Sequence, residues 1–166
     1  MDLVNIRAAA SADIPRMLHL ERRCSSAAHW AEQQYQQLFQ AEDGRPRRLV
    51  LVAGAWLPPQ SSEPGAEPDS RVLGFLIARH IVPEWELENV VVAPTARRKG
   101  LGRQLVNLLL DRARETNSDS VFLEVRESNV AARTLYENVG FELSGRRKAY
   151  YTDPMEDALL YRWQLP

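Results

Sequence analysis

The 166-residue chain has few of the residues that carry disulfide, metal or redox chemistry. Cys24 is its one cysteine, so the chain cannot form an internal disulfide, and a lone cysteine fits a reducing compartment. The three histidines, His19, His29 and His80, are scattered without the spacing of metal ligands. We therefore expect no metal site and no nucleophilic cysteine.

Long apolar runs and a strong charge of one sign are also missing. No stretch reaches the about 20 apolar residues that a membrane-spanning helix needs, and the first residues lack the apolar core of a signal peptide. The formal net charge of -1 argues against general nucleic-acid binding. These absences predict a cytoplasmic protein that binds neither membranes nor nucleic acid directly.

The chain instead shows an alternation of strand and helix patterns, and its length suits one domain, 1–166. Helices are expected after Ser11, at 31–40, from within or just after the stretch RRKGLG at 97–102, and after Asn129. Strands are expected at 3–8, 48–56, 71–81, 84–94, 120–126, 141–151 and 157–163. The segment 57–70, LPPQSSEPGAEPDS, is rich in Pro, Ser and Gly, which predicts a flexible hairpin loop. One clear β-α-β unit between strand-rich ends predicts a mixed sheet with helices on its faces.

The stretch RRKGLGRQLV, 97–106, follows an apolar strand and opens a helix. Its apolar stripe is formed by Leu101, Leu105, Leu108 and Leu109. A helix N-terminus exposes unpaired backbone N–H groups and a partial positive charge. Glycines at 100 and 102 allow close approach of a bound group, and the basic residues at 97–99 add charge. The pattern predicts a cradle for a pyrophosphate, with a solvated basic turn as the alternative.

Two common nucleotide motifs fit this stretch less well. A P-loop needs Gly-Lys-Ser/Thr at the start of the helix, whereas here Lys99 precedes Gly100. A dinucleotide fingerprint could use both glycines, with Glu124 as the ribose-binding acid. However, Leu105 stands at the third glycine position, and the glycines do not follow the strand in a tight turn.

Glu124 interrupts the otherwise apolar strand 120–126. Burial of an unpaired carboxylate is costly, so this position needs a reason, and a salt bridge to a nearby arginine is the simplest one. Tyr136 lies on the apolar face of the next helix, and its hydroxyl needs a partner if it is buried. Asn129 stands where a helix N-cap is expected. Gly140 is expected to end that helix in a left-handed conformation, with Phe141 folded back onto it.

The stretch VVVAPTARRKGLGRQLV, 90–106, resembles the coenzyme-binding motif of the GNAT superfamily of N-acetyltransferases, in which Arg97, Gly100 and Gly102 match the signature. Three further stretches resemble its RimI-like branch, the ribosomal-protein-alanine N-acetyltransferases: LEVRESNVAARTLYENVGF, RRKAYY and EDALLY. The resemblance covers nearly the whole chain except 57–70. It implies the α/β GNAT fold, with a mixed, mostly antiparallel sheet and helices on both faces.

The resemblance also implies a reaction, in which an acetyl group passes directly from acetyl-CoA to a protein N-terminus. The implied acceptor is the N-terminal alanine of a small-subunit ribosomal protein. The implied general base is Glu124, and the implied general acid is Tyr136. The implied coenzyme-binding residues are Val90, Val91, Val92, Arg97, Arg98, Lys99, Gly100, Leu101, Gly102, Arg103 and Asn129.

Several alternatives stay open at this level. Glu86 and Glu88 compete with Glu124, because many other GNAT enzymes place their base on the strand that carries them. Tyr150 and Tyr151 either flank the acceptor or are ordinary strand aromatics. The acceptor could instead be a small amine or a protein lysine, and a catalytically silent acyl-CoA-binding module is the non-enzymatic alternative. The oligomeric state is open, with a monomer among the possibilities.

Overall fold

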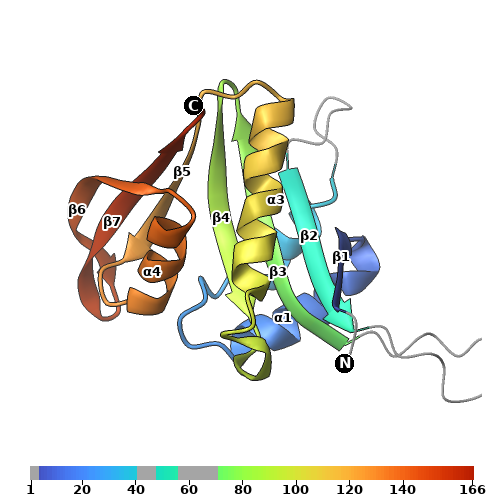
Figure 1. The fold of residues 1–166 in the computed structure, drawn as a ribbon. Helices are drawn as coiled ribbons and strands as arrows, with labels where there is room; N and C mark the ends of the chain where they lie inside the picture. Colours follow the sequence, from blue (N-terminus) through green and yellow to red (C-terminus); the bar gives the residue numbers. More distant parts are fainter. Residues whose placement is uncertain (1–3, 41–47, 56–70) are drawn as a thin grey trace, which may run out of the picture.

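The computed structural model describes residues 4–40, 48–55 and 71–166, and its strands form one seven-stranded sheet (Figure 1). The predicted loop 57–70 lies outside the described residues. The strand order is β1-β2-β3-β4-β5-β7-β6. The bounds are β1 (Val4–Ala8), β2 (Arg48–Ala55), β3 (Arg71–Ile81), β4 (Glu84–Val92), β5 (Ser120–Arg126), β6 (Glu142–Thr152) and β7 (Met155–Gln164).

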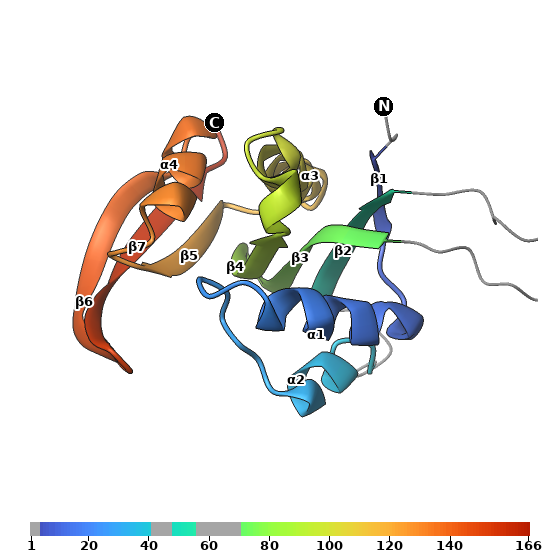
Figure 2. The same cartoon turned by 90° about the horizontal axis from the view of Figure 1, so that it is seen from below.

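The helices cover both faces of this sheet. Figure 2 shows α1 (Ile14–Arg22) and α2 (Glu32–Gln37) on one face, with α3 (Leu101–Glu115) and α4 (Val130–Asn138) on the other. Strands β4 and β5, joined through α3, pair in parallel, and the remaining neighbouring strands pair antiparallel. The predicted α/β class, with a mixed and mostly antiparallel sheet, is confirmed.

The start of α1 differs from the prediction that placed Ser11 at its N-cap. Residues Ser11–Asp13 form a short 3-10 turn, and α1 begins at Ile14 with Pro15 in its first turn. The Asp13 carboxylate accepts the N–H of Ala10 at 2.8 Å and pairs with Arg7 at 2.7 Å. A charged carboxylate is a stronger acceptor than a hydroxyl, so Asp13 and not Ser11 organises this turn.

The buried stripe of α3 also differs in part from the prediction. Leu108 was expected in the stripe but is 40% exposed. The stripe is formed by Leu101, Leu105, Val106, Leu109, Leu110 and Ala113. Successive residues turn by about 100° around a helix, which carries Leu108 past the edge of the face that meets the sheet.

Both expectations for the ends of α4 are confirmed. The Asn129 side chain caps the helix by accepting the N–H of Ala132 at 3.2 Å. At the other end, Gly140 has a left-handed φ of 98°, and the N–H of Phe141 returns to the Tyr136 carbonyl at 3.0 Å. These local contacts orient α4 behind β5 and β7.

Strands β4 and β5 separate after a short stretch of pairing. The paired positions are Glu84 with Ser120, Trp85 with Val121, and Glu86 with Phe122. Beyond Glu86, β4 continues to Val92 paired with β3 on its other side. Within the described parts of the chain, the second half of β4 therefore has one backbone edge that pairs with no strand.

Among the described residues, no helix is long and apolar enough to cross a lipid bilayer. Within the same residues, no three His, Cys, Asp or Glu side chains gather as ligands for a metal ion.

Candidate active site

The free edge of β4 begins where β5 departs. Ala93, just after β4, donates its N–H to the carbonyl of Leu73 on β3 at 2.8 Å, so these two residues form a hydrogen-bonded pair. In an antiparallel ladder such pairs alternate with residues whose N–H and C=O point away from the partner strand. Val90 and Val92 occupy those alternate positions and direct their backbone groups to the free edge. An extended chain that contains amides can pair with such an edge.

Two neighbours of this edge were not foreseen. The Arg97 Nε donates to the Val92 carbonyl at 3.1 Å, and the Cys24 thiol approaches the same oxygen at 3.8 Å. Val91, which was predicted among the coenzyme-binding residues, turns its backbone toward β3 and buries its side chain. The edge is therefore built from Val90 and Val92, with Val91 anchoring it in the core.

The N-terminus of α3 follows directly after β4. Gly100 is its N-cap residue, and glycine has no side chain that could cap the first turn. The first intrahelical bond runs from Gln104 to the Gly100 carbonyl at 3.0 Å, which leaves the preceding N–H groups open to solvent or a ligand. Four cationic side chains around this turn are exposed: Arg97, Arg98, Lys99 and Arg103. The arrangement has the chemistry of an anion site.

The two glycines of this turn have different structural reasons. Gly100 has a φ of 80°, and a Cβ there would meet nothing within 4 Å, so the left-handed backbone is what requires glycine. A Cβ at Gly102 would lie 3.1 Å from Leu135 Cδ2 and 3.6 Å from Val92 Cγ2. Gly102 thus allows α4 to pack against α3, which adds to the predicted role of close approach to a ligand.

Glu124 lies on β5, on the sheet face opposite to Leu123 because adjacent strand residues alternate. Its Oε1 pairs with Arg147 Nε at 2.9 Å, and its side chain is 25% exposed. The ion pair that was one explanation for this residue is therefore present. Arg147 is 55% exposed, so breaking its ion pair with Glu124 costs little free energy.

The rival carboxylates Glu86 and Glu88 are also paired with arginines. Arg79 binds Glu86 at 2.7 Å, and Arg48 binds Glu88 at 3.1 Å. A bulge opposite Ile77 and Ala78 leaves Glu88 without a register partner on β3. The Glu88 side chain is the less exposed of the two, at 12%, and it also lies 3.8 Å from Arg79. Glu88 is therefore held by two arginines, whereas Glu86, like Glu124, has one arginine partner and a partly exposed side chain.

Tyr136 lies on the α4 side of the sheet. Its ring centroid is 5.8 Å from that of Phe141 and 6.4 Å from that of Tyr161, whose register partner on β5 is Leu123. Burial raises the pKa of the Tyr136 hydroxyl, and nearby Tyr151 adds to the rise. The hydroxyl therefore stays protonated at neutral pH and can act as a proton donor.

Tyr150 and Tyr151 are brought to the Glu124 carboxylate. The negative charge of Glu124 is the largest cause that raises the pKa of Tyr150. Burial raises the pKa of Tyr151, and Glu124 contributes to that rise too. The two rings lie 5.2 Å apart at nearly a right angle, and the Arg126 guanidinium lies 4.1 Å from the Tyr151 ring. The two aromatic rings therefore lie on the same side of the sheet as the Glu124 carboxylate.

A buried polar cluster supports the middle of β4 and was missed from the sequence. Glu21 of α1 is 1% exposed and accepts from Asn89 Nδ2 at 2.9 Å and from the Trp30 N–H at 3.1 Å. These bonds fasten the connection between α1 and α2 to β4 beside Val90. The one available signal was an acid in an otherwise apolar helix face, and the partners lie too far away in sequence to be paired by pattern.

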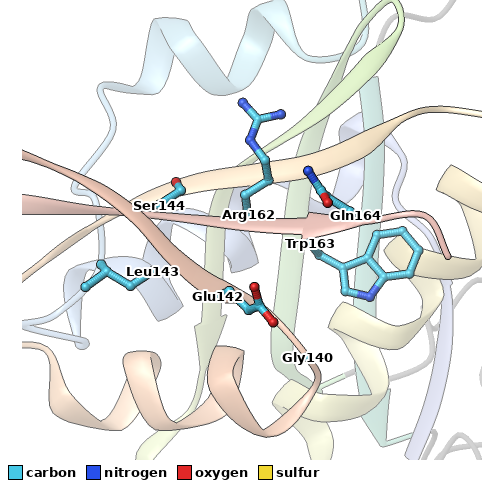
Figure 3. A pocket seen from close by; sticks show the side chains of 7 residues that line it. All are labelled: Gly140, Glu142, Leu143, Ser144, Arg162, Trp163 and Gln164. Carbon is cyan, nitrogen blue, oxygen red and sulfur yellow. The ribbon is translucent and has the colours of Figure 1, made fainter.

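A separate pocket of about 260 Å³ lies at the other end of β7 (Figure 3). Gln164 in this pocket pairs with Ser120 at the start of β5, whereas Glu124, near the end of β5, pairs with Leu160. The pocket contains none of the predicted site residues, so it is not the candidate active site. Its lining is Gly140, Glu142, Leu143, Ser144, Arg162, Trp163 and Gln164.

Residues 14–141 match the acetyltransferase (GNAT) family, and the chain belongs to this family of acetyltransferases. More particularly, it is 33% identical over 150 residues to the [ribosomal protein bS18]-alanine N-acetyltransferase of Escherichia coli K12, a match that covers 89% of this chain and 88% of that protein. The counterpart in Salmonella typhimurium is 31% identical over 153 residues, covering 91% and 90%. The predicted likeness to the RimI-like branch is confirmed.

Solved structures show the same fold. The crystal structure of the ribosomal-protein-S18-alanine N-acetyltransferase from Escherichia coli superposes with a TM-score of 0.76 and 30% identity, over 98% of this chain and 94% of that one. Arabidopsis thaliana NAA60 in complex with acetyl-CoA superposes with a TM-score of 0.80 over 98% of both chains. That protein is 16% identical to this chain, so its likeness concerns the fold alone.

Proposed function

We propose that this acetyltransferase transfers an acetyl group from acetyl-CoA to the N-terminal α-amine of a protein, the N-terminal alanine of ribosomal protein bS18. The observation that carries the proposal is Glu124 on the sheet face that also carries two tyrosine rings. Tyr150 lies against Arg147, the partner of Glu124, and Tyr151 lies against Arg126 of the same strand. The similarity over nearly the whole chain to the Escherichia coli enzyme that bears this name supports the acceptor. An acceptor of this kind is made in the cytoplasm, and residues 1–166 would act as one N-acetyltransferase domain.

The residues around the end of β4 fit the coenzyme. The open N–H groups at the start of α3 and the exposed cations at 97–99 and Arg103 complement phosphates. The backbone edge at Val90 and Val92 complements a chain of amides. The Asn129 oxygen is used by its own helix, which leaves the amide nitrogen as its donor. Acetyl-CoA, when bound, supplies the acetyl thioester.

Glu124 and Tyr136 then divide the proton transfers. A carboxylate oxygen of Glu124 takes a proton from the acceptor amine, directly or through a water molecule. An α-amine has a pKa of about 7.7–8.0, against about 10.4 for lysine, so one carboxylate suffices for this acceptor. The buried Tyr136 hydroxyl gives its proton to the departing sulfur. Since these residues lie on opposite faces of β5, the reacting groups would meet where β4 and β5 separate.

The ion pair between Arg147 and Glu124 has to break in this mechanism. The Arg147 guanidinium contacts the Glu124 oxygen that would face the amine, and it lies 5.5 Å from the Tyr150 ring. A cationic amine that enters beside the tyrosines can take the place of this guanidinium without leaving the carboxylate unpaired. Transfer in one ternary complex needs no acyl-enzyme, which agrees with the burial of Cys24 away from solvent.

A panel of acceptors tests the proposal. Purified protein is incubated with acetyl-CoA and peptides that differ only in their first residue, and acetylated products are quantified by mass spectrometry. We expect the alanine-first peptide to react best, and a peptide with a blocked N-terminus and a free lysine not to react. Faster acetylation of that lysine peptide, or of a polyamine, would assign the enzyme to another acceptor class.

A further inference from the structure

Two consecutive tyrosines of β6 lie on the Glu124 face of the sheet, which a regular strand does not permit. The Tyr150 ring lies 5.5 Å from the guanidinium of Arg147, which pairs with Glu124. The Tyr151 ring lies 4.1 Å from that of Arg126, which shares the Glu124 face of β5. Adjacent side chains of a strand point to opposite faces. The register pairs Arg147 with Ala158 and Tyr151 with Glu156, so residues 148–150 lie opposite a single residue of β7. At the centre of this bulge Ala149 has a φ of 50°, a left-handed conformation that residues with a Cβ disfavour. Such a backbone persists where surrounding contacts hold it.

Asp157 of β7 makes those contacts. Its Oδ1 accepts the Ala149 N–H at 2.8 Å, and its Oδ2 accepts from Arg146 Nη1 at 2.8 Å. The Ala149 N–H and then Arg146 lower the pKa of Asp157, so it is ionised at neutral pH. Arg146 is bound in turn by both oxygens of Glu127, at 2.7 and 3.0 Å. The bulge thus rests on a chain of charged hydrogen bonds that starts at Asp157.

We propose that Asp157 is a positioning residue of the acceptor site, because it holds Ala149 in the left-handed conformation that turns both Tyr150 and Tyr151 toward Glu124. The proposal rests on the proposed function in one respect, namely that the two tyrosines contact the acceptor. Asp157 itself lies on the other face of β7 from Ala158 and touches no reacting group. Its effect on acceptor binding passes through the backbone of Ala149.

Peptide kinetics provide the first test. Asp157→Ala should raise the KM for an alanine-first peptide about 10-fold or more, since a smaller share of molecules presents both tyrosines. Asp157→Asn keeps an acceptor oxygen and should fall between this variant and the unaltered protein. Affinity for acetyl-CoA, measured by calorimetry, should change less than about 2-fold in both. Asp153→Asn removes one charge from the same hairpin and should leave the peptide KM unchanged.

A backbone rescue separates positioning from general destabilisation. Glycine adopts the left-handed conformation readily, so Ala149→Gly added to Asp157→Ala should restore most of the lost peptide affinity. Failure of this double variant to recover would overturn the proposal, because it would show that the left-handed turn is not what Asp157 supplies.

The ionisation of Tyr150 tests the geometry without any acceptor. Each protein is titrated beside its Tyr150→Phe version, and the difference in ultraviolet absorbance reports the Tyr150 hydroxyl. Glu124 raises the pKa of Tyr150, so in Asp157→Ala its midpoint should fall toward the ordinary value of about 10. An unchanged midpoint would refute the positioning role even if no peptide were ever acetylated. A lowered midpoint with an unchanged peptide KM would refute the link to the acceptor site.

Discussion

The substitution Glu124→Gln separates the two explanations of this residue, which are an ion pair and a catalytic base. The amide keeps the shape of the side chain but cannot accept a proton. Partly exposed ion pairs such as Glu124 with Arg147 contribute about 0.2–1 kcal/mol to the free energy of unfolding. A positioned general base contributes about 10²–10⁴-fold to the rate, equivalent to about 2.7–5.5 kcal/mol of activation free energy. The expected loss of turnover is therefore far larger than any loss of stability.

Glu86→Gln is the matched control. Glu86 lies on the neighbouring strand and pairs with Arg79 at 2.7 Å, and the exposure of its side chain, 28%, is close to the 25% of Glu124. The control loses a comparable ion pair and one negative charge, and we expect near-normal turnover for it. Glu88→Gln extends the comparison to the other rival on β4.

The assay measures release of free coenzyme thiol at saturating acetyl-CoA and peptide, beside coenzyme affinity by calorimetry and unfolding in urea. Glu124→Gln should lose about 10²-fold or more in turnover while coenzyme affinity and unfolding stay nearly constant. Turnover above about a tenth of normal would refute the assignment of the base. A collapse of turnover in Glu86→Gln or Glu88→Gln alone would move that role to β4.

Four further outcomes are expected. Tyr136→Phe keeps the packed ring and should lower turnover about 10²-fold without a change in melting temperature; full turnover would remove it as the acid. Gly100→Val places a β-branched residue at a left-handed φ and should cost about 1–2 kcal/mol in unfolding free energy. The loss of acetyl-CoA binding free energy, measured by calorimetry, should be larger than this loss of stability. Asn89→Ala strips a donor from buried Glu21 and should cost about 1–3 kcal/mol in urea unfolding. Arg7 lowers the pKa of Asp13 below its ordinary value of 3.8, so ionised Asp13 stabilises the fold at neutral pH. The difference in unfolding free energy between the unaltered protein and Asp13→Asn should therefore shrink as the pH falls through 3.8 and below.

Features that depend on a few neighbouring residues were predictable from the sequence. The start of α3 at Leu101, the Asn129 cap and the left-handed Gly140 each follow from residues within one helical turn. The family signature likewise lies in a continuous stretch. The prediction that Leu108 is buried was wrong, because the contact with the sheet decides which helix residues are buried. The sequence pattern alone does not specify that contact.

The partners within the site could not be predicted, because they come from distant segments. Arg147 reaches Glu124 only through the pairing of β5, β7 and β6, and two bulges in β6 shift that register. Glu21 and Asn89 are 68 positions apart. The pairing of strands that are distant in sequence leaves no periodic pattern in the sequence. Each candidate side chain could therefore be identified, but its electrostatic partner could not.

The acceptor that we propose for this enzyme is an N-terminal α-amine. It is tested most directly with one peptide that carries both an N-terminal alanine and an internal lysine, incubated with acetyl-CoA and the unaltered protein. Fragmentation mass spectrometry locates the acetyl group on either nitrogen. We expect the unaltered protein to acetylate the α-amine and Glu124→Gln to lose this activity. Acetylation of the lysine with a free N-terminus, or equal activity in Glu124→Gln, would contradict it.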